Sequence, residues 1–248
     1  MYNDLYKFFD FNAPNPNGAD AEATEQTDDC ETAVCEHSGD GSVTVNKNGS
    51  YIHCITVIGQ IEGHYSSPPN SKSTKYEHII PRLVAVEENP DISGLLIILN
   101  TIGGDIEAGL AIAELISGMK KPTASLVLGG SHSIGIPLAV STKKSFIVPT
   151  ASMTVHPVRM NGLILGVPQT LVYLKKMEQR VVEFITRNCK ISAKRFKELM
   201  LNNEELVSDF GTVLDGKQAV QEGLIDCIGG LSDALEWLES NVDNSTEV

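Results

Sequence analysis

The 248-residue sequence is short of paired cysteines, of basic residues and of long apolar runs. No Cys-x-x-Cys pair occurs among its five cysteines, Cys30, Cys35, Cys54, Cys189 and Cys227. A scattered, odd-numbered set predicts neither a disulfide framework nor a metal site, and it favours a reduced, cytoplasmic protein. No stretch approaches 18 uninterrupted apolar residues, so we expect no transmembrane segment.

Lys and Arg number 19 against 32 Asp and Glu, which gives a formal net charge of −13. A charge of this sign repels phosphate backbones and argues against a nucleic-acid partner. Ten of the acids and only two of the bases lie in residues 1–50, a segment rich in Asn, Pro, Gly and Ser. We therefore predict a disordered acidic arm over 1–50, a folded domain over 51–241 and a flexible tail over 242–248.

Apolar, β-branched runs alternate with helical patterns from Tyr51 onward. All-apolar strands of this kind are typical of an α/β fold whose parallel sheet is covered by helices on both faces. Pro168 stands where a long helix should begin, at a position where its missing N–H costs nothing. The predicted strands are 51–58, 94–99, 122–128, 145–148, 153–156 and 212–214, and the main helices are 78–87, 106–119, 133–141, 168–188, 191–202 and 232–241.

Two glycine-rich segments follow predicted strands. In NTIGGDIEAG (100–109), Gly103 and Gly104 could present backbone N–H groups to an anion at a helix N-terminus, although a plain tight turn would read the same. It is neither a dinucleotide-binding nor a Walker motif. In GGSHSIG (129–135), a sharp strand-to-helix turn could expose Ser131 or Ser133 as a nucleophile, or either serine could cap the helix.

His156 closes an apolar strand in MTVHPV and is followed by proline. A lone histidine in that position is more often a packed structural residue. Open α/β sheets bind ligands at the carboxyl ends of their strands. The serine and the histidine both follow strands, which favours a shared site.

Together these segments resemble the proteolytic subunit of Clp protease (ClpP). NTIGGDIEAGLAIAELI, GGSHSIG, MTVHP and GKQAVQEGLID occur in that family's order, and Glu88-Asn89-Pro90 falls where the family has E-N-P; the likeness spans about residues 52–238. It implies a ClpP/crotonase-like fold of repeated β-β-α units with a long handle helix after Pro168. The stretches GQIEGH, TKYEHIIP, LGGSHSIGIPLAVS, HPVRMNGLILGVPQT and FKELM are similar to the family's translocation-enhancing (TepA) branch.

Carried over by position, the resemblance makes Ser133 the nucleophile and His156 its general base. Gly103 or Gly104, with the N–H of Ile134, would form the oxyanion hole, since a free serine hydroxyl is a poor nucleophile without such help.

The carboxylate that would complete a triad is less firmly indicated. Asp209 is the first choice because it lies just before a predicted strand and close to Gly211. Glu205 is the alternative by counting from His156, and Glu204 and Asp215 are weaker candidates. A carboxylate there would orient the imidazole and stabilise its cation.

The resemblance implies a serine endopeptidase (peptidase family S14) that cleaves unfolded or short polypeptides inside a homo-oligomeric ring, with no metal or organic cofactor. The apolar run 162–167 favours a subunit contact. ATP, if used, would act through a separate unfoldase, because the chain lacks a P-loop.

Three rival functions stay open from the sequence. One is a signal-peptide-peptidase-like Ser–Lys enzyme using Lys143 or Lys144. Another is a non-catalytic assembly factor in protein translocation or sporulation, a role suggested by the name of the branch and not by the residues. The third is acyl-CoA chemistry on the same fold, against which the Ser133/His156 pair argues.

Overall fold

The computed structural model describes residues 36–38, 42–47, 50–68, 70–160, 166–203 and 211–242. Its strands are β1 (Glu36–Ser38), β2 (Ser42–Lys47), β3 (Ser50–Glu62), β4 (Ser73–Lys75), β5 (Ile92–Gly104), β6 (Thr123–Ser131), β7 (Lys144–Ile147), β8 (Ser152–Val155), β9 (Thr212–Asp215) and β10 (Cys227–Ile228). Its helices are α1 (Tyr76–Glu88), α2 (Ile106–Gly118), α3 (Gly135–Val140), α4 (Val167–Asn188), α5 (Ala193–Leu201), α6 (Gly216–Gln221) and α7 (Leu231–Val242).

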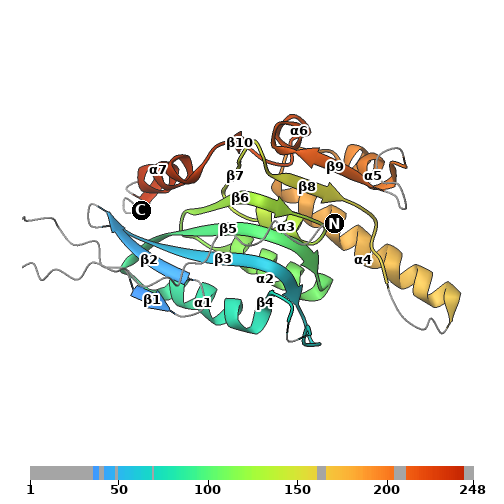
Figure 1. Cartoon of the computed structure of the whole chain (residues 1–248), viewed down its shortest axis with the longest axis horizontal. Helices are drawn as coiled ribbons and strands as arrows, with labels where there is room; N and C mark the ends of the chain where they lie inside the picture. The colour runs from blue at the N-terminus through green and yellow to red at the C-terminus, as the bar shows by residue number, and fades with distance from the viewer. Residues whose placement is uncertain are drawn as a thin grey trace, which may run out of the picture. The chain divides into compact units, whose positions relative to one another are not determined.

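The strands form a mostly parallel sheet in the order β1-β2-β3-β5-β6-β7-β10 (Figure 1). Pairing is parallel from β3 through β10, and β1 and β2 add an antiparallel edge. At the end of β6, β8 pairs in parallel and carries β9 antiparallel to itself. The predicted α/β fold with a parallel sheet is therefore confirmed.

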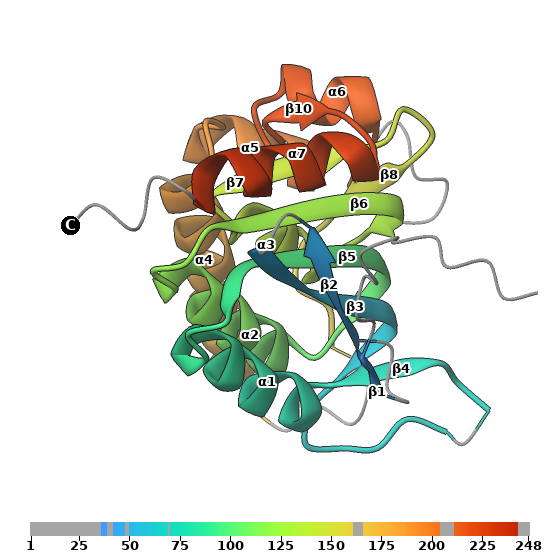
Figure 2. The ribbon, with the colours of Figure 1, turned by 90° about the vertical axis from the view of Figure 1, so that its left-hand side faces the viewer.

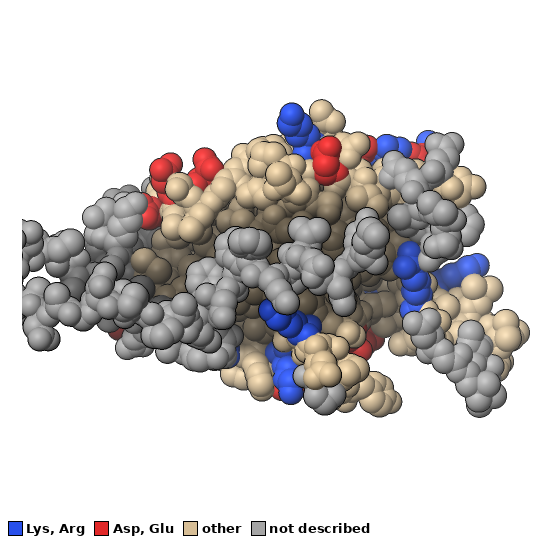
Figure 3. Space-filling view, in the orientation of Figure 1, with Lys and Arg blue, Asp and Glu red and all other residues tan. Residues whose placement is uncertain are grey.

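Helices cover the sheet on both faces, with α1 and α2 on one side and α7 on the other (Figure 2). Successive side chains of β5 alternate between two apolar cores, as strand geometry requires. Leu95, Ile97 and Leu99 enter the larger core, which includes residues of α1, α2, α3 and α4. Leu96 enters the smaller core beside Leu238 of α7. Figure 3 shows acidic and basic side chains interspersed on one face of the described surface.

Two strands lie inside residues 1–50, where the composition predicted a disordered arm, and for these residues the prediction was wrong. Strand β2 pairs antiparallel with β3, with Val43 opposite Cys54 and Val45 opposite Ile52. Val43 also packs against the core beneath α7. Val43 and Val45 alternate with polar residues, as expected of a strand, but the polar composition around them favoured the prediction of disorder. Residues 1–35, 39–41 and 48–49 of the predicted arm and residues 243–248 of the predicted tail lie outside the described residues.

Strands β5 and β6 run farther than the sequence predicted, through both glycine pairs. Gly103 and Gly104 have φ values of 89° and 154°, and both still belong to β5. A Cβ atom on Gly104 would lie 2.1 Å from the carbonyl oxygen of Ile61. Gly129 and Gly130 likewise lie within β6. Both predicted turns are strand ends. Neighbouring backbone leaves no room for a Cβ at Gly104, and the side chains of Asn100 and His132 leave none at Gly129 and Gly130.

Helix α4 agrees with the helix predicted after Pro168 and projects beyond the sheet along its first half (Figure 1). Its second half buries Val182, Phe184 and Ile185 in the larger core. Its first half leaves Leu171 and Val172 about half exposed, at 52% and 54%. Residues 162–165 of the apolar run before it lie outside the described residues. No helix in the described part of the chain is both long and apolar enough to cross a membrane.

Candidate active site

Ser133 lies in the turn between β6 and α3, and its backbone is left-handed, with φ of 56°. Among the described residues, it is the one non-glycine residue with a positive φ. A side chain in this conformation costs about 1–3 kcal/mol and persists only where the surroundings enforce it. Such strain is typical of functional sites, and the turn lies where the sequence predicted a sharp strand-to-helix connection.

Backbone hydrogen bonds hold this turn from two sides. The N–H of Ser133 donates to the carbonyl oxygen of Thr154 in β8 at 2.9 Å, and the N–H of His132 donates to that of Thr101 in β5 at 3.1 Å. The first turn of α3 adds a bond from Gly135 N–H to the carbonyl oxygen of His132. The conformation of Ser133 is therefore fixed by β5, β8 and α3 together.

Ser131, the other serine of this segment, has a different environment. Its side chain is fully buried, and its hydroxyl donates to the carbonyl oxygen of Gly135 at 2.7 Å. The Ser131 hydroxyl therefore stabilises the turn from its buried side and is not exposed to a substrate. Ser133 is only half-buried, which leaves it as the candidate nucleophile.

Gly103 lies directly against the turn. A Cβ atom built on it would lie 2.8 Å from the Cβ of Ser133 and 3.4 Å from the amide nitrogen of Ile134. Ile134 is the N-cap residue of α3, so its N–H has no acceptor within that helix. The N–H of Gly103 donates to the side-chain oxygen of Thr101 at 3.1 Å. The structure thus brings Gly103, Ser133 and Ile134 together.

His156 follows the last residue of β8 and is half-buried. Its Nδ1 lies 2.7 Å from the carbonyl oxygen of Pro157. A carbonyl oxygen can only accept, so Nδ1 carries the proton in the neutral imidazole and Nε2 is the unprotonated nitrogen. Strand β8 runs parallel to β6 from the pairing of Gly130 with Ser152. His156 and Ser133 therefore follow the same ends of two paired strands.

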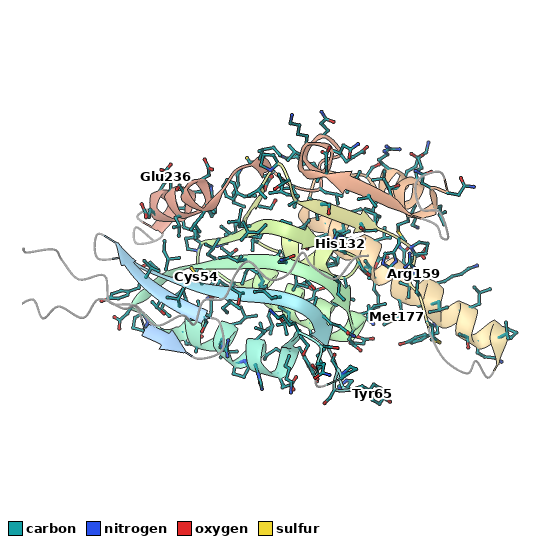
Figure 4. The ribbon with its side chains drawn as sticks, viewed as in Figure 1. Cys54, Tyr65, His132, Arg159, Met177 and Glu236 are labelled. Atoms are coloured by element: carbon teal, nitrogen blue, oxygen red, sulfur yellow. The ribbon has the colours of Figure 1, made fainter. Side chains whose placement is uncertain are left out.

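His132 was not singled out by the sequence analysis, although it stands where the resembled pattern has a small residue. Its Nδ1 lies 3.1 Å from the backbone nitrogen and 2.9 Å from the hydroxyl oxygen of Thr154. Burial lowers the pKa of His132, and the charge of His156 lowers it further. Figure 4 labels His132 at the end of β6.

Of the four candidate carboxylates for the triad, the structure describes one, Asp215. Asp209, Glu205 and Glu204 lie outside the described residues. Asp215 is exposed, and its side chain accepts a hydrogen bond from the N–H of Gln218 at 2.8 Å. It forms a capping box at the start of α6. The carboxylate of Asp215 is therefore engaged at a helix end.

Lys143 and Lys144 lie at the wrong end of the sheet to serve Ser133. Lys144 pairs with Ala124 near the start of β6, whereas Ser133 follows the last residue of that strand. At about 3.3 Å per residue, seven strand residues separate these positions by about 20 Å. The Nζ of Lys143 donates to the carbonyl oxygen of Lys120. The geometry argues against a Ser–Lys dyad that uses either lysine.

A pocket of about 240 Å³ opens beside the end of β5. The N-terminal end of α2, the segment after His156 and the first half of α4 surround it, and Figure 4 labels Arg159 and Met177 there. Its lining is Gly104, Asp105, Ile106, Glu107, Val158, Arg159, Met160, Tyr173, Leu174 and Met177. Within the described ranges, no group of three or more His, Cys, Asp or Glu side chains is placed to hold a metal ion.

Known proteins share both the sequence and the fold. A family model described as Clp protease matches residues 54–231. Over 194 residues the chain is 59% identical to translocation-enhancing protein TepA of Halalkalibacterium halodurans, covering 78% of this chain and 76% of that protein. It is 29% identical over 157 residues to the ATP-dependent Clp protease proteolytic subunit of Streptococcus uberis, covering 60% and 76% of the two chains.

The fold comparison agrees with these matches. A solved structure of a ClpP1 mutant from Listeria monocytogenes superposes with a TM-score of 0.58 at 18% identity, covering 73% of this chain and 94% of that chain. The family model alone spans well over half of the chain. This chain therefore belongs to the Clp protease family.

Proposed function

We propose that this protein is a serine endopeptidase with Ser133 as nucleophile and His156 as general base. The observation that carries the proposal is the strained turn at Ser133, which is held against Gly103 and the amide of Ile134. The lone pair on Nε2 of His156, which follows from the bond of Nδ1 to Pro157, supports it. Membership of the Clp protease family agrees with this activity.

In this mechanism the Oγ of Ser133 attacks the carbonyl carbon of the scissile bond while Nε2 of His156 takes the hydroxyl proton. The N–H of Ile134 and a glycine N–H stabilise the oxyanion of the tetrahedral intermediate. Gly104 is the better second donor, because the N–H of Gly103 already donates to Thr101. His156 then protonates the leaving amine, and water hydrolyses the acyl-enzyme.

We propose Asp209 as the carboxylate that stabilises the imidazolium, with Glu205 as the alternative. Thr212 at the start of β9 pairs with Val155, the residue before His156. The start of β9 therefore lies beside the histidine, and Asp209 is nearer to that start along the chain than Glu205. Asp209→Asn should lower activity far more than Glu205→Gln if this assignment is right.

The substrate we propose is an unfolded or short polypeptide. The pocket beside β5 combines apolar side chains, including Met160, Tyr173 and Met177, with three charged side chains. Its apolar lining residues suit an apolar side chain next to the scissile bond. We further propose a cytoplasmic, ring-shaped homo-oligomer in which α4 makes subunit contacts. A separate unfoldase would supply ATP-driven unfolding if the reaction uses it, and the similarity to TepA suggests substrates linked to protein translocation.

Labelling with a fluorophosphonate probe tests the activity. We expect the wild-type protein to react, Ser133→Ala and His156→Ala to lose labelling, and Ser131→Ala and Lys144→Ala to retain it. Loss of labelling in Lys144→Ala together with retention in His156→Ala would instead support the Ser–Lys enzyme. A wild-type protein that never reacts, in any assembly state, would overturn the proposal in favour of a non-catalytic assembly factor.

A further inference from the structure

The strand that carries His156 has little regular pairing to the strand that leads to Ser133. In the described residues, β6 and β8 share one ladder position, Gly130 with Ser152. Thr154, two residues before His156, also links β8 to the turn. Its carbonyl oxygen accepts from the N–H of Ser133 at 2.9 Å. Its N–H and its hydroxyl both lie within hydrogen-bond distance of Nδ1 of His132.

The imidazole of His132 is held in one orientation. A Cβ atom built on Gly130 would lie 2.3 Å from Nε2 of His132 and 3.0 Å from the two ring carbons beside it. The imidazole therefore occupies the space that a side chain at position 130 would need. This packing directs Nδ1 toward Thr154, 22 residues along the chain.

The bond to Thr154 also determines the protonation state of His132. A backbone N–H can only donate, so Nδ1 must be an unprotonated acceptor and the proton sits on Nε2. Burial and the charge of His156 both lower the pKa of His132, which agrees with a neutral imidazole. A second proton would face the N–H of Thr154 and repel a protonated His156. The neutral form of His132 thus keeps its hydrogen bond with the N–H of Thr154, and it does not repel the cation that forms on His156.

We propose that His132 is a positioning residue that fixes β8, and with it His156, against Ser133 through the two hydrogen bonds to Thr154. The inference rests on the proposed serine peptidase activity and adds to it a residue outside the expected triad. The side chain of His132 holds the general base through Thr154. The geometry that it maintains is the distance and direction between the serine hydroxyl and the imidazole, where a displacement of about 1 Å can cost about 10²-fold in rate.

The test measures fluorophosphonate labelling as a maximal rate and a probe affinity, for the full chain. We expect His132→Ala to lower the maximal rate about 10²-fold and to leave the probe affinity within about threefold, because the hydroxyl and the probe site are intact. His132→Asn carries an acceptor close to the position of Nδ1 and should recover most of the rate. Thr154→Val removes one of the two bonds and should give an intermediate loss. His78→Ala, at an exposed histidine on α1, is the matched control and should react like wild type.

A purely structural role would lower labelling only through loss of folded protein, so thermal unfolding of each variant is recorded alongside. His132→Ala at the wild-type rate would overturn the proposal. So would a folded His132→Asn that is as slow as His132→Ala.

Failure of the proposed activity is recognised separately, by a wild-type protein that does not react. The proposal for His132 is then decided by imidazole ¹⁵N shifts. A neutral His132 protonated on Nε2 at pH 7, together with shifts of His156 that change in His132→Ala, would support it. A charged His132, or one protonated on Nδ1, would overturn it.

Discussion

Gly103 and Ser133 lie so close that a Cβ atom on the glycine would come within 2.8 Å of the Cβ of the serine. The same atom would lie 2.8 Å from the carbonyl oxygen of His132, and the φ of 89° at Gly103 already disfavours any side chain. We therefore expect Gly103→Ala to destabilise the protein by about 1–3 kcal/mol. Because the methyl group displaces the turn itself, labelling of Ser133 should fall more steeply than stability.

Gly118→Ala is the matched control, since a Cβ atom on this helical glycine of α2 meets nothing within 4 Å. It should leave labelling unchanged and raise stability by up to about 1 kcal/mol. Urea unfolding and labelling of both variants test the comparison. Equal labelling in the two would mean that Gly103 has no part in forming the site.

The left-handed backbone of Ser133 predicts that a substitution which abolishes activity can raise the free energy of unfolding. Replacing Ser133 by Gly relieves a conformational cost of about 1–2 kcal/mol and adds about 0.5–1 kcal/mol of chain entropy to the unfolded state. Ser133→Gly should thus be inactive and more stable by about 1 kcal/mol, a rise in Tm of about 2–4 °C. Ser133→Ala is equally inactive but keeps a Cβ, so its Tm should stay near that of wild type. A Tm of Ser133→Gly at or below that of Ser133→Ala would contradict the idea of strain.

Much of this arrangement could be predicted from the sequence, and the remainder depended on tertiary contacts. Ser133 and His156 could be singled out because each follows an apolar run that forms a strand, and this pattern is local in the sequence. The two glycine pairs were found but interpreted as turns, because nothing in their neighbourhood reveals the backbone of Ile61 that approaches Gly104. The link from His132 to Thr154 joins residues far apart in the chain, so no local signal could indicate it. Asp209 stays a prediction.

Glu62 at the end of β3 should give the protein an acid-sensitive contact. It is buried, and its Oε2 accepts from the hydroxyl of Ser73 in β4 at 2.5 Å. That hydrogen bond is the main cause that lowers the pKa of Glu62 in the folded state, with the charge of Lys75 adding to it. A carboxyl whose pKa is lowered by folding stabilises the protein above its unfolded pKa of about 4.3, and this contribution is lost as the pH falls through the folded value.

We therefore expect Glu62→Gln and Ser73→Ala to be less stable than wild type at pH 7. The difference should shrink as the pH falls below about 4, where the wild-type carboxyl becomes protonated. Denaturant unfolding at pH 7, 5 and 3.5 measures it, with the exposed Glu88→Gln of α1 as control. A difference that stays constant across this range would show that the carboxylate charge contributes nothing.

Helix α4 is attached to α2 by ion pairs whose contribution should be small. Arg180 donates to the two carboxylate oxygens of Glu107 through its two terminal nitrogens, Nη1 and Nη2, at 2.7 and 2.9 Å, but both side chains are about half exposed. Water and salt screen such a pair, so Arg180→Ala should cost about 0.2–1 kcal/mol, and less in 1 M NaCl. Phe184 of the same helix is only 2% exposed and lies in the larger core. Phe184→Ala should therefore lower the free energy of unfolding by about 3–5 kcal/mol. Denaturant unfolding at low and high salt measures both variants. If the ion pairs were the main attachment, Arg180→Ala would lower stability more than Phe184→Ala.

The exposed first half of α4 should respond differently from the buried second half. Leu171 is 52% exposed and Tyr173 is 49% exposed, which leaves apolar surface uncovered in a single chain. If α4 makes the proposed subunit contact, Leu171→Glu places a charge in it and should shift sedimentation velocity toward smaller species. Gln179→Glu adds the same charge on the second half of the helix and should leave the assembly unchanged. The effect of Leu171→Glu would recur at every copy of a symmetric contact, so a cost of about 1.4 kcal/mol, a tenfold loss of affinity, would apply at each of them. An unchanged sedimentation coefficient for Leu171→Glu would mean that subunits meet through another surface.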